Sequence, residues 1–125
     1  HIKAQALLVD DNEMNRFFNS RLLKSLGVDV TTVDSGKQAL QRLQQASFDV
    51  IFIDVNMPEM DGYTLTTRVR GDSRMADFFI VLHSSLSGVF NKAMVEKVGA
   101  DDFMAKFSPD ELAERVMTVV DQLHQ

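Results

Sequence analysis

The 125-residue chain contains no cysteine and no tryptophan. Without cysteine, the protein has neither disulfides nor thiol chemistry. No apolar run approaches the roughly 20 residues that a membrane-spanning helix needs, and the amino end lacks the pattern of a signal peptide. The formal net charge is −5 and the lysines and arginines are dispersed, which argues against a nucleic-acid-binding surface. We expect a cytoplasmic protein whose partners include neither a membrane nor a nucleic acid.

The length of the chain suits one domain with a hydrophobic core and is short for two. No internal repeat, low-complexity segment or interdomain linker interrupts the sequence. The chain begins with His1 instead of methionine. We therefore expect residues 1–125 to be a single domain excised from a longer protein, with residues 1–3 as a linker or a cloning remnant.

Strand-like and helix-like patterns alternate five times along the chain, which is typical of βαβ units and a parallel sheet. The run from Val50 to Ile53 is apolar on both faces, as expected of a central strand. The predicted strands cover residues 6–9, 28–33, 50–53, 78–82 and 102–105. The pattern predicts an α/β fold with a doubly wound parallel sheet between helices.

Each predicted helix shows apolar residues at helical spacing on one face. Asp11 or Asn12 can cap the first helix and Gly27 ends it, Ser35 caps the second, and the capping box at residues 108–111 starts the last. The expected inward faces are Met14, Phe17, Phe18, Leu22 and Leu26; Ala39, Leu40 and Leu43; Leu65 and Val69; Phe90, Met94, Val95 and Val98; and Leu112, Val116, Val119 and Leu123.

Chemically active side chains stand where the predicted strands end. Asp10 and Asp11 follow the first strand, Asp54 follows the third, Ser84 the fourth and Lys106 the fifth. Parallel strands end at one edge of their sheet, where open α/β sheets place their ligand sites. The sequence thus predicts one acidic pocket with one cation and one hydroxyl.

Carboxylates gathered in one pocket repel one another unless a proton or a cation joins them. A pocket of oxygen ligands suits Mg²⁺, and Asp10 and Asp11 are the residues expected to hold it. Asp54, on the central strand, is the best-placed nucleophile toward phosphorus. In such a transfer Lys106 would pair with one phosphoryl oxygen and Ser84 would donate a hydrogen bond to another. These residue types predict phosphoryl transfer to Asp54.

These residues resemble the receiver domain of two-component response regulators, over nearly the whole chain. The most specific match is the string Asp54-Val55-Asn56-Met57-Pro58-Glu59-Met60-Asp61-Gly62, and the acidic pair, Ser84, Gly99-Ala100 and Lys106 occupy the other family positions. The resemblance implies a (βα)5, flavodoxin-like or CheY-like fold with a five-stranded parallel sheet in the order 2-1-3-4-5.

The resemblance also implies a role for each site residue. A histidine kinase would phosphorylate Asp54, and Mg²⁺ would be held by Asp11, Asp54 and the backbone carbonyl of Asn56, with Asp10 contributing through water. The family couples the phosphoryl group to Ser84 and to an aromatic residue on the fifth strand, here Phe103. That coupling remodels the surface formed by the fourth helix, the fifth strand and the fifth helix.

A narrower resemblance concerns chemotaxis. Residues 83–88 (HSSLSG), residues 99–103 (GADDF) and Lys106-Phe107 are similar to the receiver half of CheV-type coupling proteins. This resemblance implies a CheA-like kinase as the phosphodonor and a CheW-like coupling domain elsewhere in the protein. Phe107 stands where most receivers have proline, and a cis bond costs about 3 kcal/mol or more without proline, so the Lys106–Phe107 bond is expected to be trans.

Two other functions stay open on the sequence alone. A pseudo-receiver would keep the fold and bind partners without using the pocket, although all five site positions are intact. A small-molecule phosphohydrolase of the haloacid dehalogenase type needs a second aspartate two residues after the nucleophile, where this chain has Asn56. The phosphoacceptor is therefore the leading hypothesis, the pseudo-receiver the second and the phosphohydrolase the third.

Overall fold

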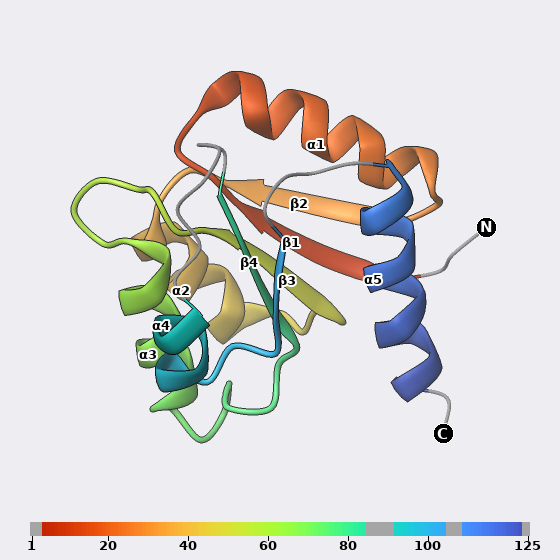
Figure 1. The fold of residues 1–125 in the computed structure, drawn as a ribbon. Helices are drawn as coiled ribbons and strands as arrows, with labels where there is room; N and C mark the ends of the chain where they lie inside the picture. The colour runs from red at the N-terminus through yellow and green to blue at the C-terminus, as the bar shows by residue number, and fades with distance from the viewer. Residues whose placement is uncertain (1–3, 85–91, 105–108, 124–125) are drawn as a thin grey trace.

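The computed structural model describes residues 4–84, 92–104 and 109–123, which build one parallel sheet between helices (Figure 1). The strands are β1 (Gln5–Val9), β2 (Asp29–Val33), β3 (Val50–Asp54), β4 (Ile80–His83) and β5 (Asp102–Met104). The helices are α1 (Glu13–Ser25), α2 (Gly36–Gln45), α3 (Gly62–Arg70), α4 (Lys92–Val98) and α5 (Pro109–Leu123). The strand order β2-β1-β3-β4-β5 confirms the predicted fold.

Helices cover both faces of the sheet. α1 and α5 lie over one face, and α2, α3 and α4 lie over the other (Figure 1). Alternate residues of β3 feed the two cores: Ile51 and Ile53 pack toward α2, α3 and α4, while Val50 and Phe52 pack toward α1 and α5. The apolar run at 50–53 is thus the central strand, and Asp54 ends it in the middle of the carboxyl edge.

Side-chain caps fix the starts of three helices near that edge. Asn12 accepts a hydrogen bond from the backbone N–H of Asn15 and so caps α1, and Ser35 caps α2 as predicted. Asp61 caps α3. Gly27, with φ of 90°, follows the end of α1 in the left-handed conformation that glycine adopts readily. The chain therefore leaves each of these strands in a defined direction.

The predicted inward face of α1 is wrong in its first half. Met14, Phe17 and Phe18 are 59%, 49% and 58% exposed, and the buried residues of the helix are Ser20 and Leu23. Most of the predicted inward residues of the other helices are confirmed. The predicted inward residues that the structure buries are Ala39, Leu43, Leu65, Val69, Val95, Val98, Leu112, Val116 and Val119.

The side of α1 that faces the sheet carries a polar contact as well as an apolar one. Arg16 donates a hydrogen bond through Nη1 to the backbone oxygen of Asp10 at 2.8 Å, and Leu23, two helical turns later, is buried. Apolar residues occupy two sides of α1, and their spacing alone does not tell which side meets the core.

The other differences concern element ends. β4 begins at Ile80 and not at Phe78; the carbonyl of Phe78 instead accepts a hydrogen bond from Arg70. Phe90, Ala105 and Ser108 lie outside the described residues, as does the side chain of Leu123. Within the described ranges, no helix is both long enough and apolar enough to cross a membrane.

The two sides of α1 should respond differently to truncation. Leu23→Ala is expected to lower the free energy of unfolding by about 2–5 kcal/mol, because it leaves a cavity in the core. Phe18→Ala should change it by less than about 1 kcal/mol, since the ring is mostly exposed. Urea unfolding followed by circular dichroism measures both. Equal losses in the two variants would contradict the observed orientation of α1.

Candidate functional site

Asp10 and Asp54 lie side by side at the carboxyl edge of the sheet. β1 and β3 are parallel neighbours with Val9 opposite Ile53, and an aspartate comes next on each strand. Both side chains are fully buried, whereas Asp11 is exposed. One carboxylate oxygen from each of the three aspartates lies within 4.8 Å of the others. The structure therefore brings together the three carboxylates that the sequence predicts.

Hydrogen bonds satisfy only half of each buried carboxylate. Oδ1 of Asp10 accepts from the backbone N–H of Asn12 at 2.9 Å, and Oδ1 of Asp54 accepts from that of Asn56 at 3.0 Å. The Oδ2 atoms of both aspartates are buried and accept no hydrogen bond from the described part of the chain. Buried oxygens of this kind are costly unless a donor or a cation meets them.

Burial also changes the acidity of the pair. It raises the pKa of Asp10 from 3.8 to about 7, and the neighbouring carboxylates of Asp54 and Asp11 raise it further against the hydrogen bond from Asn12. Burial raises the pKa of Asp54 as well. Two unsatisfied carboxylate oxygens and an exposed third carboxylate fit a hard divalent cation such as Mg²⁺, which prefers oxygen ligands and retains water on its open side. Asp10, Asp11 and Asp54 are the residues that would hold it.

Ser84 reaches the same edge from β4. It is buried directly after His83, and its Oγ accepts a hydrogen bond from Nδ2 of Asn56 at 2.7 Å. This contact joins the loop after β3 to the end of β4. The resemblance assigns a metal-binding role to the backbone carbonyl of Asn56, and nothing in the sequence pattern predicts that its side chain bonds to Ser84. The contact depends on a side-chain rotamer that only the folded loop defines.

Gly62 fixes the position of α3 behind Asp54. A Cβ atom at this residue would lie 2.5 Å from the backbone oxygen of Asp54 and 2.8 Å from Cα of Val55. Only glycine allows this approach without a shift of the backbone. Gly62 is the first residue of α3, and its contact with the backbone of Asp54 is set by the fold and not by the sequence pattern.

The other predicted residues have mixed outcomes. Phe103, on β5, packs partly buried against the core shared with α2, α3 and α4, and its role as a switch stays a prediction. Lys106 and Phe107 lie outside the described residues.

Comparison with known proteins decides the family. The sequence model for the response regulator receiver domain matches residues 6–117. The chain belongs to this family. Protein PilG of Pseudomonas aeruginosa is 33% identical to it over 109 residues, which are 86% of this chain and 81% of PilG. The probable transcriptional regulator ycf27 of Guillardia theta is 34% identical over 119 residues, or 94% of this chain, but these are only 46% of that longer protein.

Solved structures agree with the assignment of this receiver domain. The chemotaxis protein CheY4 of Vibrio cholerae is 33% identical with a TM-score of 0.84, over 94% of this chain and 98% of CheY4. The receiver domain of the sensor histidine kinase PA1611 of Pseudomonas aeruginosa is 28% identical with a TM-score of 0.85, over 95% and 98% of the two chains. That domain was solved with a magnesium ion coordinated in its active site cleft.

Membership places this chain in two-component signalling. Receiver domains bind Mg²⁺ in an acidic active site and take phosphate from histidine kinases. In this chain, Asp10, Asp11 and Asp54 form an acidic cluster at the carboxyl edge of the sheet. The fold thus brings carboxylates that are distant in sequence together at one edge of the sheet.

The raised pKa of Asp10 should make the effect of Mg²⁺ on the stability of the protein depend on pH. The folded-state pKa of Asp10, about 7, exceeds its ordinary value of 3.8, so the metal-free folded protein binds more protons than the unfolded chain between these values. The contribution of the Asp10 carboxyl to the stability of the metal-free protein therefore falls as pH rises from about 4 to about 7. Mg²⁺ should relieve this penalty, so its addition should raise the melting temperature more at pH 8 than at pH 5.

Comparison with an Asp10→Asn variant isolates the contribution of the Asp10 carboxyl to the pH dependence of stability. Metal-free wild type should lose stability relative to this variant as pH rises through the same range, because the amide does not ionise. Calorimetry of both proteins, with and without Mg²⁺, gives the difference directly. A constant difference from pH 4 to pH 8 would contradict the raised pKa.

Proposed function

We propose that this chain is a phosphoacceptor receiver domain over residues 1–125 of a cytoplasmic, chemotaxis-type signalling protein, with Asp54 as the residue that accepts the phosphoryl group from a histidine kinase. The observation that carries this proposal is the buried Oδ2 of Asp54, which receives no hydrogen bond from the described residues and lies in a cluster with two other carboxylates. A buried carboxylate oxygen without a hydrogen-bond donor can attack phosphorus when a cation offsets the negative charge around it.

The residues suggest how the transfer proceeds. An oxygen of Asp54 forms a bond to phosphorus while the bond from phosphorus to the kinase histidine breaks, and the electron pair of that bond returns to the imidazole. Asp10, Asp11, Asp54 and the backbone carbonyl of Asn56 would hold Mg²⁺, which neutralises charge on the phosphoryl oxygens when bound. Ser84 would donate a hydrogen bond to the aspartyl phosphate, and Lys106 would pair with another oxygen. The hydroxyl of Ser84 already accepts a hydrogen bond from the side-chain amide of Asn56. Ser84 would therefore bond both to Asn56 and to the phosphoryl group.

The chemotaxis assignment rests on sequence motifs. The segments at 83–88 and 99–103, and Lys106-Phe107, are similar to CheV-type coupling proteins. We therefore propose a CheA-like kinase as the donor and a CheW-like coupling domain as part of the same signalling system. Ser84 and Phe103 would relay phosphorylation to the surface of α4, β5 and α5. The similarity to the chemotaxis protein CheY4 supports this reading.

Intact mass spectrometry tests the central proposal. Incubation with Mg²⁺ and acetyl phosphate should add one phosphoryl group to the wild type, and chelation of Mg²⁺ or Asp54→Asn should abolish the gain. A CheA-like kinase in its phosphorylated form serves as a second donor. No gain with either donor would favour the pseudo-receiver, and steady release of phosphate from small phosphate esters would favour the phosphohydrolase.

The exposed side of α1 suggests where the kinase approaches. α1 starts at the edge that holds Asp10 and Asp54, and its first turns expose Met14, Phe17 and Phe18. The rings of Phe17 and Phe18 lie edge to face with centroids 5.4 Å apart. A donor protein that presents phosphohistidine at this edge would cover these apolar side chains, whereas acetyl phosphate would not touch them.

Phe18→Ala should therefore separate the two donors. Transfer from the kinase should slow about tenfold, as expected for the loss of an aromatic contact at an interface. Phosphorylation by acetyl phosphate should keep its wild-type rate. Met117→Ala, which removes an exposed apolar side chain from α5, is the matched control. An equal loss with both donors would show that Phe18 acts on the pocket itself and not on the kinase.

A further inference from the structure

α2 and α3 are neighbours on one face of the sheet, and a groove of about 560 Å³ lies between them (Figure 1). Its lining residues come from the side of α2 between Ser35 and Gln44, from α3, and from the loop that joins β3 to α3. The part on α2 is about 14 Å long, at a rise of about 1.5 Å per residue. The groove is therefore long enough for two turns of a bound helix.

The more deeply buried residues of the groove are apolar. Leu40 of α2 and Met60 of the loop are both half-buried and pack against the core shared by α2, α3 and α4. Met60 lies against Gly36, which leaves room for its sulfur: a Cβ atom at Gly36 would lie 2.6 Å from Sδ of Met60. The groove thus offers a partly exposed apolar floor that apolar side chains of a partner can cover.

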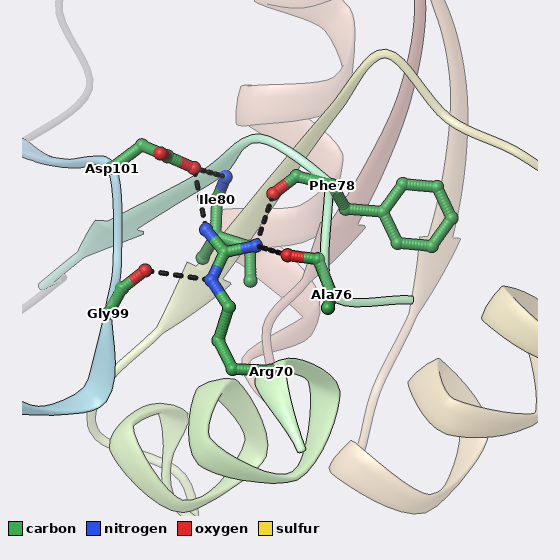
Figure 2. Close-up of polar contacts among 6 residues, drawn as sticks. All are labelled: Arg70, Ala76, Phe78, Ile80, Gly99 and Asp101. Carbon is green, nitrogen blue, oxygen red and sulfur yellow. Dashed lines mark hydrogen bonds and ion pairs between the residues drawn. The ribbon is translucent and has the colours of Figure 1, made fainter. Parts of the chain in front are cut away.

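Two cationic side chains stand on opposite walls of the groove. Lys37 lies on α2 and Arg68 on α3, and both are exposed. Within the described residues, neither forms an ion pair. Arg70, the other arginine of α3, is fully engaged, because it donates to three backbone carbonyls and to the carboxylate of Asp101 (Figure 2). The charges of Lys37 and Arg68 are thus not neutralised by a described neighbour.

The charge of this region is opposite to that of the whole chain. The chain carries a formal net charge of −5, yet neither α2 nor α3 contains an Asp or a Glu. α1, α4 and α5 each contain at least one. Among the described residues that line the groove, Glu59 is the only acidic one, and it belongs to the loop and not to either helix. The two helical walls therefore attract carboxylates.

We propose that the groove docks an acidic amphipathic helix of a partner protein. A helix that binds in a groove presents apolar side chains at i, i+3, i+4 and i+7, and the apolar floor would receive them. Carboxylates on either side of that apolar stripe would pair with Lys37 on one wall and with Arg68 on the other. This interaction goes beyond the proposed function, because it involves neither Asp54 nor a phosphoryl group.

Three peptides with blocked ends serve as probes of the groove. ELAELLEELLAE has the acidic amphipathic pattern, QLAQLLQQLLAQ is its neutral analogue, and EAAEAAEEAAAE keeps the charges but has alanine in place of leucine. Titration of wild type followed by amide NMR measures the affinity and maps the contacts. The first peptide should shift the amide resonances of α2 and α3. The other two should bind about tenfold more weakly, because each lacks one of the two kinds of contact.

Charge reversal on the walls tests the assigned cations. Lys37→Glu and Arg68→Glu should each weaken binding of ELAELLEELLAE about tenfold, since each brings like charges together. Arg42→Glu is the matched control: Arg42 is an exposed cation of α2 that lines a different cavity, beside Thr32 of β2. Its reversal should change the affinity by less than about twofold at physiological salt. Glu59→Gln removes the opposing charge and should raise the affinity about twofold.

Several results would overturn the proposal. A loss with Arg42→Glu equal to that with Arg68→Glu would show attraction to the whole basic face and not to the groove. Resonance shifts confined to α1, or no binding of the acidic peptide, would also contradict it. Displacement of the peptide by inorganic phosphate at constant ionic strength would assign the groove to small anions. Groove resonances that shift with protein concentration alone would assign it to a second copy of this chain.

Two features of the design keep the outcome interpretable. Lys37→Gln and Arg68→Gln, which remove the charge without reversing it, decide the case if a reversed variant does not fold. The titrations contain neither Mg²⁺ nor a phosphodonor. A chain that binds the acidic peptide but accepts no phosphoryl group would therefore overturn the proposed function alone, and the reverse result would overturn the docking site alone.

Discussion

Two carboxylates buried side by side are the constraint on which the site depends. Asp10 and Asp54 stand at adjacent strand ends, each with one oxygen bonded to a backbone N–H and one without a hydrogen-bond donor in the described chain. Burial raises the pKa of Asp10, and the neighbouring carboxylate of Asp54 raises it further, so ionisation of both members of the pair is unfavourable. The rest of the fold has to hold this unfavourable arrangement in place. A bound cation would offset the repulsion between the two carboxylates.

The order of the strands supplies the necessary rigidity. β3 is buried on both faces and has β1 and β4 as neighbours, so the residue that ends it has little freedom to move away from Asp10. The loop after β3 is held in turn by the bond from Asn56 to Ser84 and by Asp61 at the start of α3. The bond from Asn56 to Ser84 joins residues that are 28 positions apart in sequence, whereas the cap by Asp61 is local.

Sequence reasoning succeeded where one physical signal dominates. The apolar runs located the strands, and the topology of parallel strands placed Asp10, Asp11, Asp54 and Ser84 at one edge. It failed for the first half of α1, where Met14, Phe17 and Phe18 have the spacing of a buried face but lie in solvent. It also missed the side-chain bonds of Asn56 and Arg70, because rotamers and loop paths, which no periodicity encodes, determine these contacts.

Gly62 has a mechanical consequence. Because its backbone lies directly against the carbonyl of Asp54, with no space for even a methyl group, the start of α3 cannot come any closer to the end of β3. A displacement of α3 toward Asp54 is therefore excluded at this joint. A side chain larger than hydrogen at residue 62 would have to push the helix away from the strand, and with it the loop that carries Asn56.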